Sequence, residues 1–180
     1  MSRLWNGPGN AARICWNNMK KAEITDALIT IHQLLNEFTK PWLIIGTASL
    51  YLQGFTVKPK DVDILCSTDD ASFISEFLSP YKKHQEKNIS RDKFRSAFSR
   101  YEINGIVVEV MGGLEVNTET SGWVKLLDQI KCVEEVLFNG LTFKVPSKID
   151  QVTIYQLFGR LKDKQTLELL NATEYFNSTF

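Results

Sequence analysis

A chain of 180 residues is long enough to form one domain, and its 43% hydrophobic residues are sufficient for a substantial core. Lysine and arginine together number 21, as do aspartate and glutamate, so no whole-protein positive field favours binding to duplex nucleic acid. No apolar run is long enough to cross a membrane, and the first 18 residues lack the apolar core of a signal peptide. We therefore expect a cytoplasmic protein without a membrane or duplex nucleic acid partner.

The cysteines and histidines do not form a recognisable cluster. Cys15, Cys66 and Cys132 are widely spaced and odd in number, and they contain no C-x-x-C pair. His32 and His84 are distant from them in sequence. We therefore expect reduced, mostly buried thiols rather than a disulfide framework or a zinc site.

The N-terminal part predicts a lead-in followed by a helix. Residues 1–18 have little periodicity, which predicts a loosely ordered segment before a single domain over residues 19–180. From about residue 20 to residue 39, apolar residues recur every three or four positions, the pattern of an amphipathic helix. Pro41 ends this helix because proline cannot continue it.

Two strands alternate with helices in the next segment. The apolar run of residues 42–46 predicts a buried strand, and the helix expected after it ends at Gly54. In residues 61–67, Asp61, Asp63 and Leu65 alternate with Val62, Ile64 and Cys66, which predicts a second strand. A helix capped by Thr68 or Asp69 should then run to about residue 79.

Two hairpins and two helices complete the expected fold. Asn104-Gly105 and Asn139-Gly140 are strong two-residue turn signals, each between strand-forming runs. Between the hairpins, Gly112-Gly113 predicts a break and a less regular segment. Two helices, over about 148–158 and 162–176, should form a C-terminal helical extension covering residues 147–180. The order of elements indicates an α/β or α+β domain with a mixed β-sheet flanked by helices.

Three features of this arrangement suggest chemistry. Gly46-Thr47 lies at a strand–helix junction, where glycine permits close approach of a ligand and free N–H groups attract phosphate, although many such turns bind nothing. Asp61 and Asp63 lie on one face of their strand, a pattern that a solvent-facing acidic stripe would also produce. Glu109 has only apolar neighbours in sequence, which is unusual for a surface carboxylate.

The free energy of burying charge favours a cation near these acids. Removing an unpaired carboxylate from water costs on the order of several kcal/mol, whereas whole domains are stable by only about 5–15 kcal/mol. If the two strands pair, Glu109 joins Asp61 and Asp63 on one face. Mg²⁺ suits such a cluster because it combines one or two carboxylates with substrate phosphates.

The combined motifs resemble the nucleotidyltransferase superfamily, the DNA polymerase beta-like group, whose hallmark is G-[GS], a short helix, D-x-D and a later strand acid. The resembling segments are GTASLYLQG, KPKDVDIL and INGIVVEVMGG, and the tail GRLKDKQTLELL is similar to a G-R-x-K-D helix. The similarity is greatest to the minimal, lincosamide and abortive-infection branches. It extends from about Pro41 to Leu170.

The resemblance implies a role for each matched position. Gly46 and Thr47 would hold the β- and γ-phosphates, with Thr47 replacing the usual glycine or serine. Asp61, Asp63 and Glu109 would be the catalytic carboxylates that bind Mg²⁺ or Mn²⁺, and Glu109 would also act as a base toward the acceptor hydroxyl.

The basic residues are weaker candidates. Lys60, Arg160 and Lys162, together with Arg95, could contact the triphosphate or the acceptor, or could be solvated surface charges. Asp163 is expected to pair with a nearby basic residue rather than with metal. Trp123 is a candidate for stacking on a base, with a core position as the alternative.

The implied activity is transfer of a nucleoside monophosphate from a nucleoside triphosphate, ATP being the expected one, to a hydroxyl acceptor on a small molecule or a protein. Two alternatives stay open. The chain could hold nucleotide without turnover, or it could act as an antitoxin-like protein on a protein partner.

Overall fold

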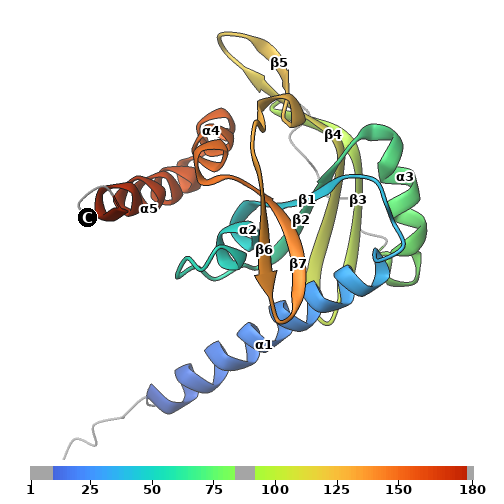
Figure 1. Cartoon of the computed structure of the whole chain (residues 1–180), viewed down its shortest axis with the longest axis vertical. Coiled ribbons are helices and arrows are strands. Elements are labelled where there is room, and N and C mark those ends of the chain that lie inside the picture. Colours follow the sequence, from blue (N-terminus) through green and yellow to red (C-terminus); the bar gives the residue numbers. More distant parts are fainter. Residues whose placement is uncertain (1–9, 84–91, 178–180) are drawn as a thin grey trace, which may run out of the picture.

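The computed structural model describes residues 10–83 and 92–177, with side chains described over residues 22–83 and 92–171. Its helices are α1 (Asn10–Leu34), α2 (Gly46–Leu52), α3 (Thr68–Phe77), α4 (Lys148–Phe158) and α5 (Leu161–Asn177). Its strands are β1 (Trp42–Ile45), β2 (Asp61–Cys66), β3 (Phe94–Ile103), β4 (Ile106–Thr118), β5 (Gly122–Lys125), β6 (Val133–Phe138) and β7 (Leu141–Pro146). Two short 3-10 turns lie at Ser79–Tyr81 and Leu127–Gln129. Figure 1 shows these elements.

A five-stranded mixed sheet has the order β1-β2-β4-β3, with β5 paired to the end of β4. β1 runs antiparallel to β2, β2 parallel to β4, and β4 antiparallel to β3 and β5. β6 and β7 form a separate two-stranded sheet. The mixed sheet and flanking helices confirm the predicted fold class.

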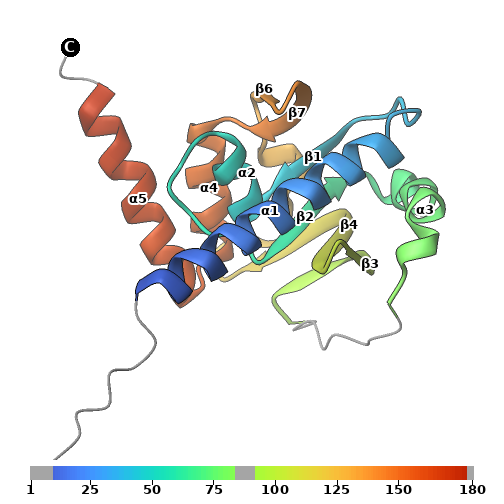
Figure 2. The same ribbon diagram turned by 90° about the horizontal axis from the view of Figure 1, so that it is seen from below.

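Two hydrophobic cores lie on opposite faces of the sheet. Figure 2 shows the helices that flank it. On one face, α1 and α3 pack over alternate residues of the central strands, including Ile64 and Val108, and over Phe143 of β7. On the other face, α4 packs over Leu65 and Leu114, and Leu167 and Leu170 of α5 belong to the same core. Because side chains alternate along a strand, Asp61 and Asp63 share the second face with Leu65. The acidic pair is therefore on the side that α4 covers.

Both predicted hairpins are present. Asn104 and Gly105 have φ values of 51° and 77°, and Asn139 and Gly140 have 50° and 78°. Two consecutive positive φ angles define the turn type that matches the twist of an antiparallel pair. The turn between β3 and β4 places Ile103 opposite Ile106 and so sets the register of both strands.

The N-terminal helix differs from its expected bounds. α1 begins at Asn10, so residues 10–18 of the expected lead-in are helical, and it ends at Leu34 rather than near residue 39. The segment contains Ala11, Ala12 and Arg13, which have high intrinsic helix propensity and need no apolar periodicity to be helical. Residues 1–9 lie outside the described residues.

The expected break after Met111 was wrong, because β4 continues through both glycines to Thr118. A Cβ atom at Gly112 would lie 2.4 Å from Ala71 Cβ on α3, and one at Gly113 would lie 2.0 Å from Thr68 Oγ1. The two glycines therefore allow α3 to pack closely on β4, and they do not end the strand.

The C-terminal helices are present as predicted, but α4 is part of the domain core. Ile154, Tyr155 and Phe158 are all buried against the sheet. Gly159, in the left-handed conformation with φ of 61°, ends α4 and allows α5 to start in a new direction. None of the helices in the two described ranges combines the length and apolar character required to span a membrane.

The thiols whose environments are described, Cys66 and Cys132, are free. Cys66 is buried, and this burial, with a smaller contribution from the charge of Asp70, raises its pKa to about 12. Cys132 is exposed, contrary to the expectation for a buried thiol. The side chain of Cys15 and the whole of His84 lie outside the described residues.

We expect Gly112→Ala to lower the free energy of unfolding by about 1–3 kcal/mol, because the added methyl group overpacks against Ala71. Ala71→Gly alone should cost about 0.5–1 kcal/mol through helix propensity. The double variant should lose less free energy of unfolding than the two single variants lose when added together, because Ala71→Gly removes the clashing atom. Denaturant unfolding of the four proteins measures this coupling, and strictly additive losses would contradict the packing explanation.

Candidate active site

One cavity of about 480 Å³ opens on the sheet face that α4 covers. Its walls come from the end of β1 and the start of α2, from β2, β3 and β4, and from α4 and the start of α5. It is lined by most of the residues that the sequence suggested for metal or nucleotide binding: Gly46, Thr47, Lys60, Asp61, Asp63, Glu109, Arg160 and Lys162. The fold thus brings together positions separated by up to 116 residues, from Gly46 to Lys162.

The carboxylates meet because β2 and β4 are parallel and in register. Asp63 pairs directly with Glu109, and Asp61 pairs with Val107. Neighbouring strands lie about 4.8 Å apart, and in-register side chains point to the same face. Asp61 and Asp63 are partly exposed to the cavity, whereas Glu109 is buried. The predicted convergence of the three acids on one face is therefore present in the fold.

Glu109 forms an ion pair with Arg100 of β3. Nε and Nη2 of Arg100 donate to Oε1 of Glu109, at 3.1 and 2.6 Å. Their side chains are 19% and 7% exposed, so solvent screens this pair only weakly. Arg100 fixes the orientation of Glu109 and supplies the charge that allows a carboxylate to be buried there.

Gly46 is required by the position of Asp63. Gly46 has φ of +69°, and a Cβ atom at this position would lie 2.7 Å from Oδ2 of Asp63. The sequence suggested that glycine permits approach of a ligand. The structure adds that it leaves space for the Asp63 carboxylate itself.

The turn at Gly46 is held from behind by a buried chain of hydrogen bonds. The Ser49 hydroxyl donates to the Gly46 carbonyl at 2.7 Å, and Nε2 of Gln151 donates to the Ser49 hydroxyl at 2.7 Å. Ser49 and Gln151 are fully buried. Because Gln151 belongs to α4, this chain links the position of α4 to that of the turn.

No protein-family model and no curated protein matches the chain. Among solved structures, a Thermotoga maritima protein assigned to the nucleotidyltransferases has a TM-score of 0.70 and 26% identity, over 88% of this chain and 95% of that protein. The motifs described above occupy the sheet and cavity of the same fold. The chain belongs to the nucleotidyltransferase superfamily.

Two more distant structures share the nucleotidyltransferase fold. A lincosamide antibiotic adenylyltransferase bound to lincomycin has a TM-score of 0.54 and 13% identity, over 81% of this chain and 94% of that one. The antibiotic-resistance enzyme ANT(2")-Ia, in complex with adenylyl-2"-tobramycin, also has a TM-score of 0.54 and 13% identity, over 84% of this chain and 89% of that one. At these identities the comparison supports the fold alone.

The G-R-x-K-D segment of this nucleotidyltransferase forms the start of α5. The carboxylate of Asp163 accepts hydrogen bonds from the Arg160 backbone N–H, from Nε and from Nη2, at 3.0, 2.8 and 3.0 Å. This local pairing of Asp163 was predicted, and it caps the first turn of α5. The Arg160 guanidinium also lies 4.8 Å from the ring centroid of Phe158. Arg160 is therefore fixed at the cavity rim by several contacts.

Two weaker candidates lie elsewhere. Arg95, which the sequence offered as a triphosphate contact, forms an ion pair with Glu115 and does not line the cavity. Its guanidinium lies 4.2 Å from the ring centroid of Trp123. Arg95 thus covers one face of the Trp123 ring.

The residues of the cavity fit a divalent cation that shares its shell with a substrate. Asp61 and Asp63 offer oxygen atoms, which Mg²⁺ and Mn²⁺ prefer, and basic side chains for phosphate line the same cavity. Within the described ranges, no three acidic, histidine or cysteine side chains converge closely enough to hold an ion by themselves. An ion bound by two aspartates would therefore need further ligands, such as phosphate oxygens and water.

Two residues of the site were missed in the sequence: Arg100, which pairs with Glu109, and Tyr155. Arg100 could have been found by counting outward from the Asn104-Gly105 turn, because the pairing of Ile103 with Ile106 places Arg100 opposite Glu109. Tyr155 carried no signal that distinguished it from a core residue. It is 3% exposed and lines the cavity. Burial raises its pKa, as do the charges of Asp163 and Asp63, and the Thr47 hydroxyl lies close enough to lower it in part.

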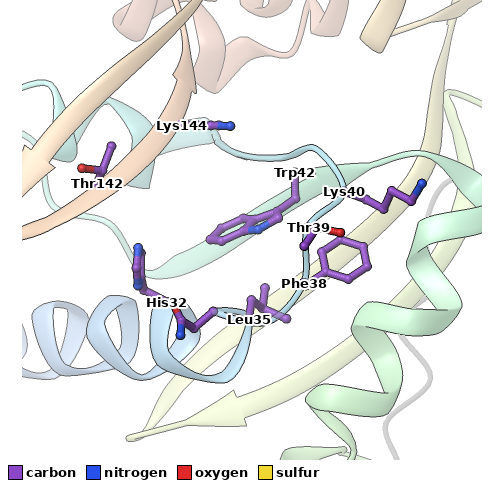
Figure 3. Close-up of a pocket in the computed structure, with 9 residues that line it drawn as sticks. His32, Leu35, Phe38, Thr39, Lys40, Trp42, Thr142 and Lys144 are labelled. Atoms are coloured by element: carbon purple, nitrogen blue, oxygen red, sulfur yellow. The ribbon is translucent and has the colours of Figure 1, made fainter.

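A second cavity, of about 180 Å³, lies between the end of α1 and β7 (Figure 3). Trp42 lines it together with His32 on α1 and with Thr142 and Lys144 on β7. None of the residues proposed for metal or nucleotide lines it. His32 packs edge-on against Phe143, with ring centroids 5.2 Å apart, and the sequence gave it no catalytic role.

We expect Gly46→Ala to abolish metal-dependent nucleotide binding, because the new methyl group displaces the Asp63 carboxylate. Gly54→Ala, at the other end of α2, is the matched control. Gly54 has φ of +87° and open space around its Cβ position. Both variants should lose about 1–2 kcal/mol of stability from backbone strain. Calorimetry with Mg-ATP should detect binding only to Gly54→Ala, and equal binding by both variants would contradict this role of Gly46.

Proposed function

We propose that this nucleotidyltransferase transfers a nucleoside monophosphate from a metal-bound nucleoside triphosphate, ATP being the expected one, to a hydroxyl acceptor. The observation that carries the proposal is the register of Asp63 with Glu109, with Asp61 on the same face, inside a cavity that also contains basic residues. Acids alone would suit a cation, and basic residues alone would suit an anion. Together they suit a metal–triphosphate complex.

In this proposal Asp61 and Asp63 hold Mg²⁺ or Mn²⁺. When bound, the cation would polarise the α-phosphate and neutralise charge that develops during transfer. Glu109 faces the same region, but the oxygen Oε1 is already engaged by Arg100. We therefore assign Glu109 chiefly to the acceptor side, where it would take the proton of the attacking hydroxyl as a new O–P bond forms and pyrophosphate leaves.

The triphosphate would be held by the Gly46 turn and by the basic residues of the cavity. Gly46 and Thr47 present backbone and hydroxyl groups there, and Lys60, Arg160 and Lys162 supply positive charge. Arg160 is oriented by Asp163 and Phe158, which reduces the entropy lost when it contacts a phosphate. The chain's own residues thus mainly bind and orient the substrates, and such positioning accounts for much of the catalysis of phosphoryl transfer.

The acceptor would lie against the apolar part of the cavity. Phe94, Phe98 and Met111 line it beside the charged residues, and Phe94 contacts Phe158 edge-on with ring centroids 5.5 Å apart. A small molecule with an apolar or ring-shaped body and a reactive hydroxyl fits this wall. A hydroxyl on a protein side chain is the other acceptor that we consider. The proposal places the reaction in the cytoplasm.

A second function deserves a test because of the Arg100–Glu109 ion pair. An arginine that engages the third acid occupies one of its oxygens, as would be expected in a protein that binds nucleotide without turnover. Such a protein could act on a protein partner, as an antitoxin-like member of the superfamily would.

Transfer should be detected by incubating the protein with α-labelled ATP, Mg²⁺ and panels of small-molecule and protein acceptors. We expect label on an acceptor with the wild-type protein and at least a hundredfold less with Asp63→Asn, which removes a metal ligand's charge. Asp128→Asn, at an exposed aspartate outside the cavity, is the matched control and should retain activity. Nucleotide binding without label transfer to any acceptor would favour the non-catalytic function, and full activity of Asp63→Asn would contradict the assigned site.

A further inference from the structure

Tyr155 has a buried hydroxyl group that the folded chain leaves unpaired. The residue is 3% exposed, and within the described residues its Oη has no partner in hydrogen-bond geometry. Buried hydroxyls are nearly always paired, because losing water without replacement is unfavourable. An unpaired one on a cavity wall therefore indicates a partner that arrives with the ligand.

Tyr101 shows how the same fold treats a tyrosine in its core. Tyr101 is fully buried on the opposite face of the sheet, and its hydroxyl donates to Oγ of Ser99 at 3.0 Å. The fold thus gives a hydrogen-bond partner to the hydroxyl of Tyr101, which lies away from the cavity. It gives none to the hydroxyl of Tyr155, which lines the cavity.

The neighbours of Tyr155 fix where its hydroxyl lies. Gln151 and Tyr155 are four residues apart on α4 and so share one face of the helix. Gln151 is bound to Ser49, which is bound to the Gly46 carbonyl, so this face of α4 is held against the turn. Thr47 lies beside the Tyr155 hydroxyl without completing a hydrogen bond to it.

The surrounding charges favour an anionic partner. Basic residues line the same cavity, including Lys60, Arg160 and Lys162. A tyrosine hydroxyl that stays protonated donates one hydrogen bond, and phosphate oxygen is a strong acceptor. Asp63 and Asp163 lie near enough to influence Tyr155 electrostatically, so a cation at Asp63 would bring its phosphate ligands close to this hydroxyl.

We propose that the Tyr155 hydroxyl, beside Thr47, donates a hydrogen bond to a phosphate oxygen of the bound nucleoside triphosphate. This inference rests on the proposed function and adds a phosphate-binding residue that the motifs do not contain. Tyr155 would also couple the two sides of the site, because its helix is joined to the Gly46 turn through Gln151 and Ser49.

The test compares Tyr155→Phe with Tyr101→Phe, each of which removes one hydroxyl group. Affinities for Mg-ATP and for Mg-tripolyphosphate are measured by calorimetry, and melting temperatures are measured without ligand. Tyr155→Phe should bind both ligands about tenfold more weakly, because a hydrogen bond to a charged group is lost. Its melting temperature should be unchanged or higher, since the lost hydroxyl was unpaired. Tyr101→Phe should melt at a lower temperature and keep wild-type affinity.

Four results would overturn the inference. Wild-type affinity of Tyr155→Phe for both ligands would remove any role of the hydroxyl in binding. Weaker binding of Mg-ATP with unchanged binding of Mg-tripolyphosphate would place the contact on the nucleoside instead. A lower melting temperature of free Tyr155→Phe, with unchanged affinities, would make the hydroxyl structural. Wild-type protein that binds neither ligand would overturn the proposed function itself, and this inference with it.

Discussion

The parallel, in-register pairing of β2 with β4 is the constraint on which the site depends. It sets Asp63 beside Glu109 and places Asp61 on the same face, so three carboxylates share one region of the sheet. Like charges this close repel, and the fold compensates in two ways. Arg100 on the next strand neutralises the buried Glu109, whereas the aspartates face a cavity in which a cation can bind. In the proposed function, this cavity receives the cation together with the triphosphate.

The C-terminal helices close the cavity because they pack on the face of this sheet that carries the acids. α4 packs on the face that carries the acids, and its Gln151 reaches through Ser49 to the Gly46 turn. Gly159 then redirects the chain so that Arg160 and the start of α5 form the rim. Helices that the sequence suggested as an extension are thus a wall of the site, and their loss would open the cavity and expose the second core.

The sequence predicted those features whose signal lies within a few neighbouring residues, and missed those that depend on contacts between distant residues. The alternation in residues 61–67 predicted the acidic face, and the Asn104-Gly105 turn predicted the hairpin, because both signals lie within a few residues. The ion pair of Arg100 with Glu109 required a register count across that hairpin. The role of α4 depended on contacts about 100 residues apart in sequence, between Gln151 and Ser49, for which the sequence contains no local signal. The glycines after Met111 were misinterpreted as a break because the packing of α3 on β4 is also non-local.

The central claim is that Asp61 and Asp63 bind a metal–triphosphate complex in this cavity. The most direct measurement is a crystal structure with Mn²⁺ and a non-hydrolysable ATP analogue, using the anomalous signal to locate the ion. The account predicts Mn²⁺ between the two aspartates, with phosphate oxygens completing its shell and the triphosphate directed toward Thr47 and Arg160. Nucleotide bound outside this cavity, or Mn²⁺ bound without contact to either aspartate, would contradict it.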